Sequence, residues 1–123
     1  NGELWERRAG AELSPAVQVT DRAVARNAAD SEQVGADAIA HGDHVHVLFI
    51  EADSGRLYHT WRDATGDWTE PDPVVVDENV LWVRGALVTR SDGRAVYGFV
   101  YDGGSQGGSG MNRYREISLN RVD

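Results

Sequence analysis

The sequence predicts an all-β fold built from short antiparallel strands, and three observations support this prediction. Short runs of β-branched and aromatic residues are bounded by turn residues: the run at 44–50 (HVHVLFI) lies between Gly42-Asp43 and the triplet at 53–55 (DSG), and it is too short for a buried helix. Asp-Gly and Ser-Gly pairs stand beside alternating apolar residues, which is typical of hairpins because glycine accepts a positive φ. Similar stretches also recur along the chain.

The expected strands fall into three consecutive groups. They comprise residues 4–8 and 14–20, then 36–41, 44–51, 56–62 and 69–76, and finally 84–90, 94–101 and 111–119. Only the stretch 22–33 (RAVARNAADSEQ) favours a helix, with Asp21 as its N-cap. Because that stretch lacks a broad apolar stripe, we expect a short surface helix or a loop insertion there.

Internal repetition indicates how the strands are organised. The tetrapeptide GELW at 2–5 matches GRLY at 55–58, and each is followed by a glycine-containing turn and a strand with proline. Trp5, Tyr58 and Tyr114 recur at intervals of about 55 residues, and a period of that size holding four strands is typical of a β-propeller blade.

We therefore expect residues 1–123 to be a single propeller segment of roughly two blades. The end of one blade spans 4–20, a complete blade spans 34–77, and most of a further blade spans 83–119. Such a segment leaves sheet faces and strand edges uncovered, which favours association. The expected partners are the remaining blades or identical chains.

Composition excludes several function classes. Apolar residues make up 41% of the chain, which argues against disorder. Twenty acidic residues outnumber twelve basic ones, and the net charge of −8 makes a nucleic-acid partner unsuitable because phosphate binding needs a basic face. No apolar run approaches the ~20 residues of a membrane-spanning helix. The absence of cysteine excludes disulfides and thiolate metal sites.

The run at 45–76 (VHVLFIEADSGRLYHTWRDATGDWTEPDPVVV) resembles the BNR or Asp-box repeat of sialidase-like propellers. That repeat has a "VHV" strand, an "LYY-R" strand, a glycine turn, a tryptophan and an "-EP-" exit. Tectonin-like lectin propellers, whose repeats carry "G-LYH-W", are the second likeness. The chain departs from the Asp-box pattern at 62–68 (RDATGDW), which is one residue out of phase and lacks the leading serine, and again at 8–13.

The resemblance implies a bacterial protein, secreted or at the cell surface, that binds carbohydrate through its propeller. One alternative is a piece of a sialidase-like glycoside hydrolase or a polysaccharide lyase, with part of its catalytic set outside this chain. Another alternative is a protein-interaction scaffold without a small ligand.

Trp82 is the first candidate ligand-binding residue. It lies in the connection that enters an inner strand, and in propellers that connection opens on the ligand-binding face. A tryptophan there can stack on a sugar ring, with Arg84, Asp77 and Glu78 supplying polar contacts. The alternative is that Trp82 covers the core between two blades.

Catalytic candidates are few. Glu51 and Tyr101 both end second strands on the same face, and a tyrosine activated by a glutamate is the nucleophile of sialidases, so the resemblance points to this pair. The Arg-Ile-Pro motif and a complete arginine triad are absent, with Arg84 as at most one of the three arginines. No complete catalytic set is therefore recognisable in this chain.

Other candidate sites are interpreted as structural. His44 and His46 have a zinc-chelating spacing on one strand, but no third ligand is placed to complete a site, while His41 and His59 belong to other strands.

The glycine-rich segment 102–110 lacks the lysine of a phosphate loop, so we expect no nucleotide cofactor and interpret it as a mobile binding loop or an insertion. Large aromatic side chains at blade positions favour packing between blades, namely Trp5, Tyr58, Trp61 and Trp68.

Overall fold

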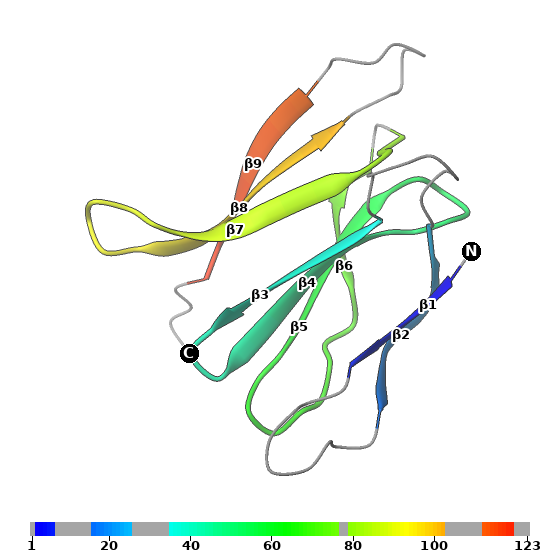
Figure 1. Cartoon of the computed structure of the whole chain (residues 1–123), viewed down its shortest axis with the longest axis horizontal. Coiled ribbons are helices and arrows are strands. Elements are labelled where there is room, and N and C mark those ends of the chain that lie inside the picture. The colour runs from blue at the N-terminus through cyan, green and yellow to red at the C-terminus, as the bar shows by residue number, and fades with distance from the viewer. Residues whose placement is uncertain (1, 7–15, 26–34, 77–78, 103–111, 120–123) are drawn as a thin grey trace.

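The computed structural model describes residues 2–6, 16–25, 35–76, 79–102 and 112–119, and these residues are all-β (Figure 1). Their strands are β1 (Gly2–Glu6), β2 (Val17–Val24), β3 (Ala36–His41), β4 (His44–Ile50), β5 (Leu57–Arg62), β6 (Asp72–Val75), β7 (Val83–Thr89), β8 (Ala95–Asp102) and β9 (Asn112–Ser118). Each strand overlaps a range predicted from the sequence. The edge strand β6 is shorter than predicted, since Pro71 and Pro73 have no N–H to donate to a sheet.

The sequence predicted a helix over residues 22–33. The structure describes residues 22–25 of this stretch, and for these residues the prediction is wrong. Arg22, Ala23 and Val24 continue β2, and Asp21 lies inside that strand and is not a helix cap. Val24 pairs with Gly2 of β1, and Ala25 N donates to Ile50 O at 2.9 Å. These long-range hydrogen bonds override the weak helical preference of an alanine-rich stretch. Residues 26–34 and the glycine-rich segment 103–111 lie outside the described residues.

The described strands form three antiparallel sheets, and neighbours in each sheet are consecutive in sequence. The first sheet is β1-β2, the middle sheet is β3-β4-β5-β6, and the last sheet is β7-β8-β9. Figure 1 shows the three sheets following one another, and β3 and β7, the first strands of the middle and last sheets, contact each other.

Glycine makes the tight turns that the sequence predicted. Gly42, between β3 and β4, has a φ of 60°, and Gly55, between β4 and β5, has a φ of 70°. Gly55 is also closely packed, because a Cβ added there would lie 1.8 Å from Asn79 Oδ1. Only glycine meets both requirements at that position.

The middle sheet is buried on both faces. Val47, Phe49 and Tyr58 pack with residues of the first sheet, whereas Leu48 and Ile50 belong to a second apolar cluster shared with the last sheet. Adjacent residues of a strand project to opposite faces, so this division follows the alternation along β4. The last five residues of β4, four of them apolar, are accordingly all buried.

Polar contacts connect the sheets as well. Tyr97 Oη of β8 donates to Asp37 Oδ2 of β3 at 2.5 Å, which links the last sheet to the middle one. Arg62 of β5 binds Glu6 of β1 through two hydrogen bonds of 2.7 and 2.6 Å, which links the middle sheet to the first. The order of packing is therefore first, middle and last sheet, as it is in sequence.

The aromatic residues do not all pack as the sequence predicted. Tyr58 is buried and Trp61 and Trp68 are partly buried, but Trp5 is 52% exposed. Trp5 lines an open groove between the first and middle sheets and is not packed between them. The prediction that Trp5 packs between sheets is therefore wrong for the described chain.

Candidate functional site

One end of the middle and last sheets brings together several of the residues predicted for the site. The turn at 51–56 and the segment 79–82 meet there, because Val80 N donates to Gly55 O at 2.9 Å. Leu81 N donates to Asp102 O at 3.1 Å, and Asp102 N donates to Trp82 O at 3.3 Å. The backbone thus places Trp82 beside the end of β8 and next to the turn that follows Glu51.

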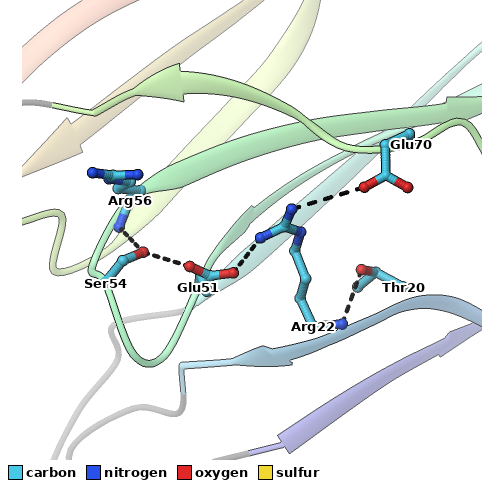
Figure 2. Close-up of polar contacts among 6 residues, drawn as sticks. All are labelled: Thr20, Arg22, Glu51, Ser54, Arg56 and Glu70. Atoms are coloured by element: carbon cyan, nitrogen blue, oxygen red, sulfur yellow. Dashed lines mark hydrogen bonds and ion pairs between the residues drawn. The ribbon is translucent and has the colours of Figure 1, made fainter.

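Glu51 is the centre of a polar cluster at this end (Figure 2). Arg22 Nη1 donates to Glu51 Oε2 at 2.5 Å, and Ser54 Oγ donates to Glu51 Oε1 at 2.7 Å. Ser54 Oγ in turn accepts from Arg56 N at 3.2 Å. The hydrogen bond from Ser54, followed by that from Arg22, holds the pKa of the Glu51 carboxyl below its ordinary value. Glu51 is therefore a stable anion rather than a proton donor.

Arg22 is the cation of this cluster. Its guanidinium lies 4.5 Å from the centre of the Tyr58 ring and 3.8 Å from the exposed carboxylate of Glu70. Its backbone N donates to Thr20 Oγ1 at 3.1 Å, and the pairing with Glu51 raises the pKa of its guanidinium. Sequence reasoning missed Arg22, because the local sequence assigned it to a helix and no short motif connects it to Glu51.

The structure places Tyr101 away from this cluster. Its ring belongs to the core between the middle and last sheets and has no exposed surface. The ring packs beside Phe99, at 6.0 Å between centres, and the Arg115 guanidinium lies 5.8 Å from its centre. Glu51 and Tyr101 end the second strands of two different sheets, so they occupy matching positions without forming the nucleophile pair that the resemblance implies.

The other predicted ligand-binding residues are distributed as follows. Trp82 is partly exposed immediately before β7, and Arg84 is exposed within that strand. Asp77 and Glu78 lie outside the described residues. Arg56 is exposed in the turn between β4 and β5, so it adds a guanidinium to the same end of the sheets.

Two histidines of β4 and β5, His46 and His59, form a buried pair. His46 Nδ1 and His59 Nε2 are 3.0 Å apart in a hydrogen bond, and both residues are buried. The ring of Trp61 lies 6.0 Å from that of His46 and 5.1 Å from that of His44. The sequence did not reveal the contact between His46 and His59, because it depends on the pairing of neighbouring strands. Within the described ranges no three His, Asp or Glu side chains are grouped to hold a metal ion.

Two open grooves lie between the first and middle sheets. One has a volume of about 390 Å³ and is lined mainly by apolar residues of β1, β3 and β4, and the other has a volume of about 440 Å³ and lies between β2 and residues 66–71. Val19 and Trp68 line both grooves, so the two are neighbours.

Comparisons with protein-family models, with curated proteins and with solved structures find no match to this chain. The resemblance to sialidase-like repeats therefore rests on the residues at 45–76. None of the described segments is a helix long and apolar enough to cross a membrane.

Proposed function

We propose that the chain is part of a β-propeller and that it binds carbohydrate at the end of the sheets that carries Trp82. The propeller is supported by the stacking of three consecutive antiparallel sheets and by the contact between their first strands, β3 and β7. Blades of a propeller are sheets of this kind, and they bury their flat faces against one another.

The observation that carries the carbohydrate proposal is the position of Trp82. Its backbone is held by Asp102, and its side chain is partly exposed beside the turn that carries Glu51, Ser54 and Arg56. A partly exposed aromatic ring can stack on the apolar face of a sugar. Guanidinium donors and carboxylate acceptors around it can bind sugar hydroxyl groups.

The cluster around Glu51 suits binding better than catalysis. Most glycoside hydrolases use two carboxyl groups with separate roles, one of them a proton donor, and sialidases use a tyrosine as the nucleophile. Tyr101 does not contact Glu51 in the described chain, so that alternative pair is not formed either. Glu51 is kept ionised by Ser54 and Arg22, and both of its oxygens already accept hydrogen bonds. A fixed anion paired with a partly exposed arginine is a polar contact surface for a neutral sugar.

The test is a screen of the intact chain on an array of neutral and sialylated glycans, followed by calorimetric titration of the best oligosaccharide. We expect Trp82→Ala to weaken binding at least tenfold and Arg56→Ala to weaken it by a smaller factor. Trp5→Ala is the matched control, because Trp5 is also exposed but lies on the first sheet. Equal affinity of Trp82→Ala and the unsubstituted chain, with both folded by circular dichroism, would contradict the proposal.

A further inference from the structure

A row of backbone hydrogen bonds joins all three sheets at the end that carries Trp82. On the first sheet, Ala23 O of β2 accepts from Ala52 N of the turn at 51–56 at 2.8 Å. The same turn contacts the segment that enters β7, because Val80 N donates to Gly55 O at 2.9 Å. Trp82 is therefore connected to β2 through the turn, although β2 belongs to another sheet.

The turn at 51–56 has its shape fixed by both backbone and side-chain bonds. Gly55 N donates to Glu51 O, and Glu51 N donates to Arg56 O, each at 2.9 Å. Ser54 Oγ donates to the Glu51 carboxylate and accepts from Arg56 N. A short polar side chain that bonds to nearby backbone in this way stabilises a turn. The Glu51 carboxylate is thus a structural part of the turn whose Gly55 carbonyl holds Val80.

The turn and the segment at 79–82 are in close contact. A Cβ added to Gly55 would lie 1.8 Å from Asn79 Oδ1, and Val80 is only 3% exposed. A close-packed contact leaves no gap that could absorb a movement of the turn. On its other side the segment is held by Asp102, whose backbone N donates to Trp82 O. The position of Trp82 therefore depends on the turn and on the end of β8.

One side chain of the first sheet orients the Glu51 carboxylate. Figure 2 shows Arg22 between Glu51 and Glu70, with its guanidinium bonded to Glu51 Oε2 while Ser54 binds Oε1. The guanidinium is itself placed over the Tyr58 ring, 4.5 Å from its centre. A planar cation held by an aromatic ring presents its N–H groups in a fixed direction. The carboxylate is therefore held in the orientation in which Oε1 faces Ser54.

We infer that Arg22 is a positioning residue of the Trp82 site. It orients the Glu51 carboxylate, the carboxylate fixes the turn at 51–56, and the turn sets the position of the segment that carries Trp82. The inference rests on the proposed function for the statement that Trp82 binds carbohydrate. The placement of Trp82 by Arg22 is itself measurable without any glycan.

The first experiment uses the intact chain labelled with ¹⁵N, and the Trp82 indole signal is assigned with Trp82→Phe. Arg22→Gln removes the cation, and we expect it to shift the Trp82 indole signal and to speed hydrogen exchange of the Val80 amide about fivefold. Arg22→Lys keeps a positive charge beside Glu51 and should restore most of both properties. Glu51→Gln should reproduce the effect of Arg22→Gln, and the double variant should add nothing, because the two side chains act in series.

Two control variants separate positioning from a general loss of stability. Glu6→Gln breaks the other ion pair between the first and middle sheets, and the Glu6 side chain is 19% exposed against 17% for Glu51. Glu70→Gln removes the second carboxylate near Arg22, which is 87% exposed. We expect both variants to leave the Trp82 indole signal in place.

The second experiment is a calorimetric titration with the oligosaccharide that ranks first on the glycan array. Arg22→Gln should weaken binding about fivefold, whereas Arg22→Lys, Glu6→Gln and Glu70→Gln should bind nearly as the unsubstituted chain does. The inference is overturned if Arg22→Gln leaves the Trp82 signal and the Val80 exchange unchanged, if Glu6→Gln changes them equally, or if the effects of Arg22→Gln and Glu51→Gln add. A shifted Trp82 signal in a chain that binds no glycan would refute the proposed function and support the placement of Trp82 by Arg22.

Discussion

Arg62 and Glu6 lie 56 positions apart in the sequence and form a two-bond ion pair between the middle and first sheets. The side chain of Arg62 is 7% exposed and that of Glu6 is 19% exposed. The Arg62 guanidinium also lies 5.7 Å from the centre of the Trp68 ring, and the hydrogen bond to Glu6 raises the pKa of Arg62. The pair therefore fastens β1 to β5 at the end of the groove away from Glu51.

The first prediction is that Arg62→Met destabilises the chain strongly. Methionine keeps the apolar stem but leaves the Glu6 carboxylate without its partner in a poorly hydrated site, so the free energy of unfolding should fall by about 3 kcal/mol. Urea unfolding followed by tryptophan fluorescence measures this change. Arg94→Met is the control, because the Arg94–Asp92 pair is 61% and 56% exposed, and it should leave the free energy of unfolding nearly unchanged. Equal effects of the two substitutions would contradict the role of the Arg62–Glu6 pair.

The second prediction concerns acid stability. Ser54 and Arg22 hold the pKa of Glu51 below the ordinary value of 4.5. A carboxyl group whose pKa is lower in the folded state stabilises the fold above the unfolded pKa, and this contribution is lost as the pH falls through the folded pKa. The free energy of unfolding should therefore decline below pH 4.5, and Glu51→Gln should flatten that decline.

Thermal unfolding of both chains at a series of pH values tests this prediction. Asp53→Asn serves as the control, since it removes an exposed carboxylate from the same turn. Parallel pH curves for Glu51→Gln and the unsubstituted chain would show that Glu51 contributes nothing to acid stability.

The third prediction is that Tyr97→Phe weakens the contact between the middle and last sheets. The substitution leaves Asp37 Oδ2 without the Tyr97 hydroxyl, and we expect a loss of about 1–3 kcal/mol in the free energy of unfolding. Burial, together with the hydrogen bond to Asp37, raises the pKa of Tyr97 above its usual range. Tyr114→Phe removes a hydroxyl that donates to Glu116 on an exposed strand, and it should be nearly neutral. A Tyr97→Phe chain as stable as Tyr114→Phe in chemical denaturation would disprove the expectation.

The fourth prediction concerns Gly85, in the interior of β7. A Cβ added there would lie 2.5 Å from Tyr97 Cε1 and 2.8 Å from the backbone oxygen of Gly98. Gly85→Ala should therefore cost about 2–3 kcal/mol of stability through overpacking. Gly42→Ala meets open space and has only the backbone cost of a positive φ, about 1 kcal/mol. Differential scanning calorimetry should rank the two variants in that order, and the reverse order would refute the packing argument.

The strands were largely predictable from local sequence. Short runs of β-branched and aromatic residues, as in β4 and β8, and turn glycines such as Gly42 and Gly55 act within a few residues, so their effect can be recognised without a structure. The prediction failed at Arg22–Val24, where a weak local preference for helix was outweighed by hydrogen bonds from β1 and from the end of β4. The local preference of a segment determines its secondary structure only where no long-range strand pairing competes with it.

The candidate site was predictable only in part. The order of the strands placed Trp82 and Glu51 at the same end of the sheets, because consecutive antiparallel strands alternate in direction. The partners of Glu51 were not predictable, since Arg22 reaches it from another sheet, and the same holds for His46 with His59. The burial of Tyr101 and the exposure of Trp5 also depend on which sheet covers which face.

The sequence by itself determined that the described part of this chain is mainly β, where most of its strands and turns lie, and which residues alternate across them. Only the tertiary structure decided how the sheets stack, which carboxylates are paired, and which groove stays open. The physical reason is range: backbone preference and side-chain alternation act between near neighbours, whereas burial and ion pairing depend on residues brought together from distant parts of the chain.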